Sequence, residues 1–100
     1  MHAVVGVWSM EEGRFDEQRR ELQEHIVPNV TRSPGFIAGY WALDPATGKT
    51  HTMIVLRDEN AASQFKTNVM ANASRQAEFG LAPDVLTVVE VIAEAHSQSA

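Results

Sequence analysis

The residues best suited to chemistry are Tyr40 and His51, which lie on either side of a strong turn signal. Residues 44–49 read Asp-Pro-Ala-Thr-Gly-Lys between two apolar segments, which indicates a hairpin. If the ends of this turn face each other, Tyr40 pairs with Met53, and the side chains of Tyr40, His51 and Met53 share one face. A tyrosine hydroxyl and an imidazole there could hold a phenolic substrate and accept its proton. The alternative is that Tyr40 is a core or interface aromatic with a satisfied hydroxyl.

His25 is a second candidate for proton transfer. Residues 14–30 carry apolar side chains at helical spacing, and His25 lies at the border of that stripe, beside Leu22 and Asn29. It could reach into a pocket above a sheet, or it could be a partly exposed helix flank. The predicted catalytic residues are therefore His51, His25 and Tyr40.

Large side chains could form the walls of such a pocket. The hairpin register predicts Phe36 on the face of Tyr40 and Trp41 on the opposite face. Packing in a core or interface is the alternative for the tryptophans. The complete set of predicted lining residues is Trp8, Phe36, Trp41, Met53 and Phe65.

The sequence does not predict a metal or a cofactor. Cysteine is absent, the four histidines have no metal-ligand spacing, and there is no phosphate-binding loop or flavin fingerprint. One arrangement could still gather ligands, because the predicted topology suggests that His2, His51 and His96 converge at one end of the sheet, near Asp44 and Glu94. His2 and His96 lie where chain ends commonly fray, so we expect no metal site.

Hydrophobic patterning predicts four strands and two helices. The expected strands are residues 3–8, 36–43, 50–56 and 84–95, and the expected helices are residues 14–30 and 60–76. Pro28 should bend or fray the last turn of the first helix. The order β-α-β-β-α-β predicts a ferredoxin-like α+β fold, with an antiparallel sheet of spatial order 4-1-3-2 and both helices on one face. We expect one domain over residues 1–96 and a polar tail over residues 97–100.

Composition limits the choice of partners. The net charge of −5 argues against nucleic acid, and no apolar run is long enough for a membrane helix. Without a secretory pattern we expect a cytoplasmic protein. Helices would cover only one face of the sheet, while residues 36–43 and 85–89 are almost entirely apolar edge strands. A second copy of the chain would protect them, so we expect a homodimer.

Several segments resemble the dimeric α/β-barrel superfamily, and within it the antibiotic biosynthesis monooxygenase-like domains. These are Ile26-Val27-Pro28 at the end of a helix, Ser33-Pro34-Gly35-Phe36, Gly39-Tyr40, the strand at 50–56 and the helix start at 58–62. The resemblance covers residues 3–94. It implies a homodimer with a pocket between sheet and helices in each subunit. Some members oxidise aromatic polyketides to quinones without metal or flavin, and others degrade haem through a histidine in the second helix.

The leading hypothesis is a cofactor-independent monooxygenase-like enzyme for a small aromatic or polyketide-like compound. A bound phenol would lose its proton to His51 or His25, Tyr40 would orient it, and the anion would react with oxygen. Residues 60–76 contain no histidine, so we do not expect haem degradation. The alternative is a non-catalytic homodimer that binds a small molecule or has a structural role.

Overall fold

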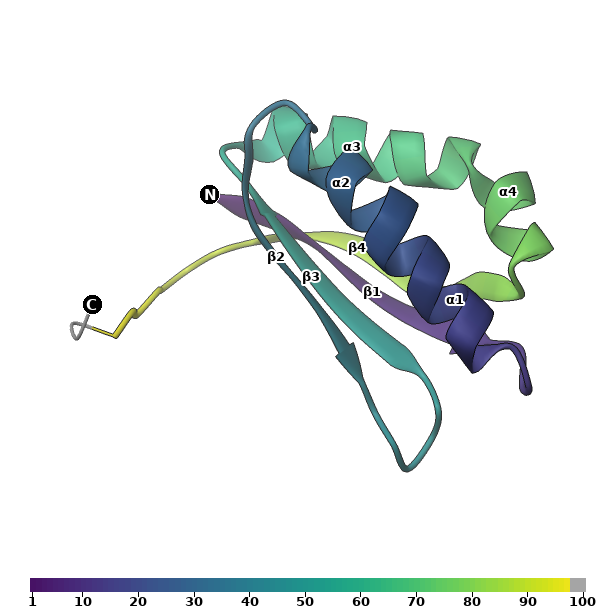
Figure 1. The fold of residues 1–100 in the computed structure, drawn as a ribbon. Helices are drawn as coiled ribbons and strands as arrows, with labels where there is room; N and C mark the ends of the chain where they lie inside the picture. Colours follow the sequence, from purple (N-terminus) through teal and green to yellow (C-terminus); the bar gives the residue numbers. More distant parts are fainter. Residues whose placement is uncertain (98–100) are drawn as a thin grey trace.

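Four strands form a single antiparallel sheet in the spatial order β2-β3-β1-β4, as predicted. The strands are β1 (His2–Met10), β2 (Phe36–Leu43), β3 (Thr50–Leu56) and β4 (Leu81–Glu90). The computed structural model describes residues 1–97, so residues 98–100 of the predicted tail lie outside the described part. Two helical segments cross one side of the sheet (Figure 1). None of the helices in residues 1–97 is long and apolar enough to cross a membrane.

The first helical segment contains a widened turn instead of a frayed end. It consists of α1 (Phe15–Glu21), the π-helical turn η1 (Leu22–Ile26) and α2 (Val27–Thr31). The backbone N–H of Val27 donates to the carbonyl of Leu22, five residues earlier. Pro28 follows directly and has no N–H to donate to the carbonyl of Glu24. A π turn accommodates this loss, and the helix continues for another turn beyond it.

The second helical segment is divided at Asn72 into α3 (Glu59–Ala71) and α4 (Ala73–Glu78), where the sequence predicted one helix. The side-chain amide of Asn72 donates to the carbonyl of Asn68 at 2.8 Å, and this local bond competes with the regular helix. Asp58 caps the start of α3 by accepting from the N–H of Ala61 at 2.8 Å. That bond holds the pKa of Asp58 below its usual value, so the cap is weakened only as the pH falls through this lowered pKa.

The last strand differs at both ends from the predicted 84–95. β4 pairs with β1 from Met10↔Leu81 to His2↔Glu90, so the two antiparallel strands pair along their full lengths. Beyond it, the N–H of Val91 still donates to the carbonyl of Met1, but Ile92 is 92% exposed. The apolar residues of the sequence continue beyond Glu90, but β1 offers no further residues for pairing, so the strand ends earlier than predicted.

The register of the β2–β3 hairpin is the predicted one near the turn, where Tyr40 pairs with Met53. A bulge then shifts the register between Phe36 and Ala38, because one extra residue, Ile37, enters β2. As a result Phe36 packs against the core on the helix side, and Ile37 is 50% exposed. The prediction that Phe36 shares the face of Tyr40 was wrong, because strict alternation fails at a bulge.

The predicted convergence of three histidines was also wrong. β1 and β3 are antiparallel, so His2 lies beside Leu56 while His51 lies beside Val7, several pairs further along the ladder. The starts of these two strands are therefore at opposite ends of the sheet. Within residues 1–97 no group of three or more histidine, aspartate or glutamate side chains is arranged to hold a metal ion.

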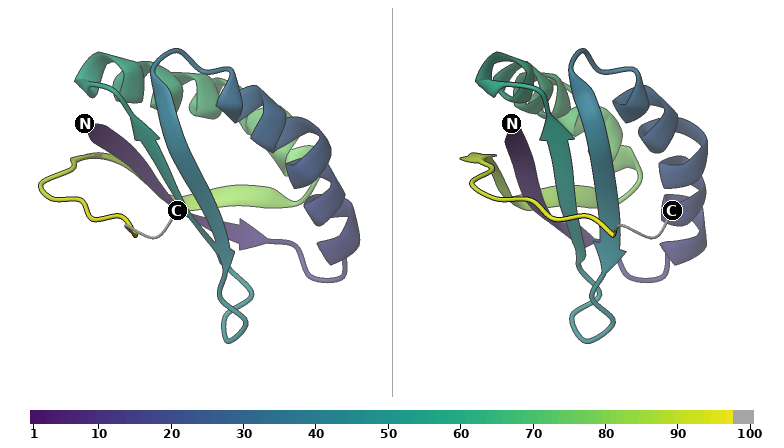
Figure 2. Two further views of the ribbon diagram at one scale, coloured as in Figure 1. Left: turned by 60° about the vertical axis from the view of Figure 1, so that its left-hand side comes forward. Right: turned by 90° about the vertical axis from the view of Figure 1, so that its left-hand side faces the viewer.

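The side of the sheet away from the helices, which we call the open face, is almost wholly apolar. Strand pairing places the same-facing residues of all four strands together: Ala3, Val5, Val7, Ala38, Tyr40, Ala42, His51, Met53, Val55, Val85, Thr87 and Val89. No helix lies on this face in either view of Figure 2. Tyr40 is 66% exposed there, although the cores of single-chain domains usually bury such aromatic side chains.

On the helix side, the core lies between the sheet and α3. Val4, Ile54, Leu56, Ala62 and Phe65 are buried and in mutual contact. Leu56 is completely buried, so removal of its side chain leaves a void that the rigid sheet cannot close.

We expect Leu56→Ala to lower the free energy of unfolding by about 2–5 kcal/mol, measured by denaturant titration. Leu43→Ala is the matched control, because it deletes the same atoms from a side chain that is 46% exposed. Equal losses for the two variants would contradict the position of the core.

Candidate functional site

A cavity of about 920 Å³ lies between the sheet and the two helical segments. This volume is in the range of small-molecule sites, which hold a ligand against apolar walls with a few polar groups. The sheet forms its floor through the helix-side residues of the strands, among them Val4, Trp8, Trp41, Thr52, Ile54 and Leu86.

Two glycines make room for the tryptophans of this floor. A Cβ atom on Gly6 would lie 2.8 Å from Nε1 of Trp8, and one on Gly39 would lie 3.1 Å from ring atoms of Trp41. The first distance is too short for a real side chain, so Trp8 occupies space that only glycine leaves, while the second would force Trp41 to shift by a few tenths of an ångström. Trp8 is fixed further, because its Nε1–H donates to Oγ1 of Thr52 at 3.3 Å.

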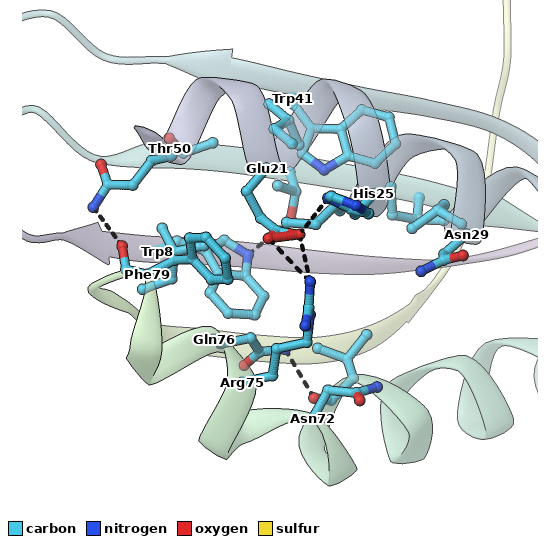
Figure 3. A pocket seen from close by; sticks show the side chains of 18 of the residues that line it. Trp8, Glu21, His25, Asn29, Trp41, Thr50, Asn72, Arg75, Gln76 and Phe79 are labelled. Carbon is cyan, nitrogen blue, oxygen red and sulfur yellow. Dashed lines mark hydrogen bonds and ion pairs between the residues drawn. The ribbon is translucent and has the colours of Figure 1, made fainter. Parts of the chain in front are cut away.

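The polar centre of the cavity wall is the carboxylate of Glu21, which is only 4% exposed. Nδ1 of His25 lies 3.0 Å from Oε1 of Glu21. Nη2 of Arg75 donates to both oxygens of Glu21, at 3.0 and 3.2 Å. Figure 3 shows Glu21 between these two partners, which come from different helical segments. We call these three residues the Glu21 cluster.

Helix geometry explains how the cluster forms. Glu21 and His25 are four residues apart, so their side chains extend from the same side of the helix. Arg75 reaches them from α4, and its guanidinium lies over the ring of Phe79 at 5.5 Å. A carboxylate removed from water needs such partners, because an unpaired buried charge is costly.

Amide side chains close one end of the cavity and line its rim. Gln18 is 2% exposed and donates to the carbonyls of Phe79 and Glu11, at 2.9 and 3.3 Å. Gln76 donates to the carbonyl of Val69 at 2.9 Å. The bond from Gln18 to Phe79 joins the first helical segment to the end of the second, while that of Gln76 stays within the second segment.

The residues predicted from sequence are divided between the two sides of the sheet. His25, Trp8, Trp41 and Phe65 line the cavity. The described lining does not include Tyr40, His51 or Met53, which belong to the open face, nor Phe36, which packs against the core. The catalytic roles given to Tyr40 and His51 stay predictions.

Sequence reasoning missed Glu21 and Arg75. Glu21 sits among other charged residues between Glu17 and Glu24, and nothing along the chain links it to Arg75. The available signal was the spacing of Glu21 and His25, which places a carboxylate beside an imidazole on one side of a helix.

The geometry suits proton transfer at His25. An ionised carboxylate can only accept hydrogen bonds, so Nδ1 of His25 carries the proton that faces Glu21. This leaves Nε2 as the basic nitrogen. Carboxylates orient catalytic histidines in the same way.

Comparison with known proteins shows which fold this is. No protein-family model matches the chain, and no curated protein matches it significantly in sequence. Among solved structures, the chain is similar to a candidate antibiotic biosynthesis monooxygenase from Deinococcus radiodurans, with a TM-score of 0.76 and 14% identity over 99% of this chain and 100% of the other. It is also similar to MupZ from Pseudomonas fluorescens, with a TM-score of 0.71 and 10% identity over 87% and 69% of the two chains.

A third similar structure is the haem degrader MhuD from Mycobacterium tuberculosis, solved with two haems in its active site. Its TM-score is 0.73, with 15% identity over 96% of this chain and 100% of the other. At such identities the likeness shows the fold. The chain has the ferredoxin-like fold of the antibiotic biosynthesis monooxygenase-like proteins, as the sequence predicted. The α3 residues that line its cavity are Phe65, Asn68, Val69 and Ala71, none of which is an axial ligand of haem iron.

The burial of Glu21 predicts an asymmetric double-mutant cycle. Arg75→Gln leaves a buried carboxylate without its cation and should lower the free energy of unfolding by about 1–3 kcal/mol. The double variant Glu21→Gln/Arg75→Gln removes both charges and should recover part of this loss. Denaturant titration of the wild type, both single variants and the double variant measures the cycle. Additive losses would show that the two side chains do not interact.

Proposed function

We propose that the chain is an antibiotic biosynthesis monooxygenase-like protein that oxidises a small aromatic, phenol-type compound with molecular oxygen. The observation that carries the proposal is the Glu21–His25 pair on the wall of a cavity with a tryptophan floor. Similarity in fold to a candidate monooxygenase supports it. The rings of the substrate would lie over Trp8 and Trp41.

The proposed reaction needs only the substrate, oxygen and a base. His25 takes the phenolic proton at Nε2, and the phenolate supplies electrons to oxygen as a C–O bond forms at the para carbon. The peroxide anion takes back the proton from His25 and becomes a hydroperoxide. Loss of the para hydrogen as a proton then breaks the O–O bond, and this proton joins the released hydroxide to form water. The products are a quinone and one water molecule, so the ring is oxidised and both oxygen atoms are reduced.

Placement favours His25 over His51 as the base. His25 lines the cavity, whereas His51 belongs to the open face on the other side of the sheet. Glu21 also fixes the orientation of the His25 ring, and a general base requires such a fixed orientation.

His25→Gln tests the assignment, because glutamine preserves a polar side chain but cannot accept the proton. With 1-naphthol as the probe and a chelator present, we expect oxygen uptake to fall by about 100-fold or more, the usual contribution of a general base. His51→Gln is the matched comparison and should retain the rate. An unchanged rate in His25→Gln would contradict the assignment. A panel of naphthols and anthrones without any oxygen uptake would favour the non-catalytic binding protein.

We infer that a second copy of the chain covers the open face, giving a homodimer. This face offers three exposed large apolar side chains from separate strands, namely Tyr40, Met53 and Val85. The proposal assigns Tyr40 to this interface. Such continuous apolar surfaces on soluble proteins mark association sites.

Light scattering after size exclusion should give twice the chain mass of 11.0 kDa at micromolar concentration. Tyr40→Glu places a charge in the middle of the open face and should yield monomers, while Tyr40→Phe should remain dimeric. A wild-type protein that elutes as a monomer would refute the interface.

A further inference from the structure

The cavity wall has a charge balance opposite to that of the whole chain. The net charge of the chain is −5, yet the acidic and basic residues among the described lining are three arginines, Arg19, Arg32 and Arg75, and a single carboxylate, Glu21. Glu21 is matched by Arg75. A concave surface of one sign with apolar walls concentrates ligands of the opposite sign.

The other two arginines have no acidic partner within residues 1–97. The guanidinium of Arg19 lies over the ring of Phe15 at 5.7 Å. Nη1 of Arg32 donates to Oδ1 of Asn29 at 3.4 Å, which is a weak contact with a neutral group. Both side chains are exposed, so their positive charges can attract a ligand from the solvent side of the lining, where salt screens them.

Arg75 also has unused hydrogen-bonding capacity. Both of its bonds to Glu21 come from Nη2, and its Nε and Nη1 have no hydrogen-bond partner in the described chain. With Nη2 engaged, Nε–H and Nη1–H are directed to different sides of the guanidinium, and each can donate a single charge-assisted hydrogen bond to a carboxylate. These donors lie beside His25, since both residues contact the same carboxylate.

We propose that the ligand of the cavity is an aromatic carboxylate. Its rings lie over Trp8 and Trp41, and its carboxylate accepts hydrogen bonds from Arg75, with Arg19 and Arg32 adding to the attraction at longer range. The inference rests on the proposed function for treating the cavity as a substrate site. A hydroxyl group next to the carboxylate would then lie beside His25, so ortho-hydroxy aromatic acids are the preferred class.

The test compares two probes that differ only in charge, 1-hydroxy-2-naphthoate and its carboxamide. Calorimetric titration at low ionic strength should give about tenfold tighter binding for the carboxylate, and added salt should reduce the difference. The chain has two tryptophans and both line the cavity, so quenching of tryptophan emission reports binding at this site.

Two variants separate the proposal from a general effect of charge. Glu21→Gln frees Arg75 from its internal partner and should strengthen binding of the carboxylate several-fold, and more than it changes binding of the carboxamide. Glu21→Gln/Arg75→Gln should remove most of the preference without leaving a buried unpaired charge, and the remainder, due to Arg19 and Arg32, should disappear on addition of salt. Arg57→Gln is the control, because Arg57 is outside the lining and its side chain is 71% exposed.

Equal affinities of the two probes for the wild type, or no binding of either, would overturn the inference. So would a preference that is undiminished in the Glu21→Gln/Arg75→Gln variant. Oxidation of 1-naphthol together with equal affinities would leave the proposed function standing and refute only the preference for carboxylates. Tight binding of the carboxylate without oxygen uptake from any probe would support the preference for carboxylates and refute the proposed oxidation.

Discussion

The buried carboxylate of Glu21 needs hydrogen-bonding or cationic partners, and this requirement determines how the two helical segments pack against each other. Glu21 is 4% exposed and takes one partner from its own helix and another from α4. The contact therefore joins two segments that are far apart in sequence. It also fixes which nitrogen of His25 is available to a ligand and which donors of Arg75 remain free. The chemistry of the cavity depends on satisfying this one buried charge.

The strand order and the hairpin register were predictable because both depend on local signals. Residues 44–49 form a turn in which the N–H of Asp44 donates to Lys49 and that of Gly48 donates to Asp44. Such a turn fixes the pairing of Tyr40 with Met53. The extra residue at Ile37 was not predictable, since a bulge leaves the hydrophobic pattern of the strand unchanged.

The centre of the site was harder to predict than the fold. A helix pattern shows which residues share a side, but it does not show what another helix brings to them. Glu21 looked like one of several charged residues of a solvated helix until α4 placed Arg75 against it. Trp8 and Trp41 were identified as lining residues by size alone, while the two glycines that make room for them become meaningful only once the distances are known.

Alternation along the strands has an evolutionary consequence. Tyr40 and Trp41 are neighbours in sequence, yet one belongs to the open face and the other to the cavity floor, and the same holds for Met53 and Thr52. Substitutions at every second position can therefore change the cavity floor without altering the open face, and substitutions at the intervening positions can change the open face without altering the cavity floor. A one-residue insertion or deletion within a strand would exchange the two sets. Descendants of this sequence should diversify by substitution within the strands and keep their length changes to the connecting loops.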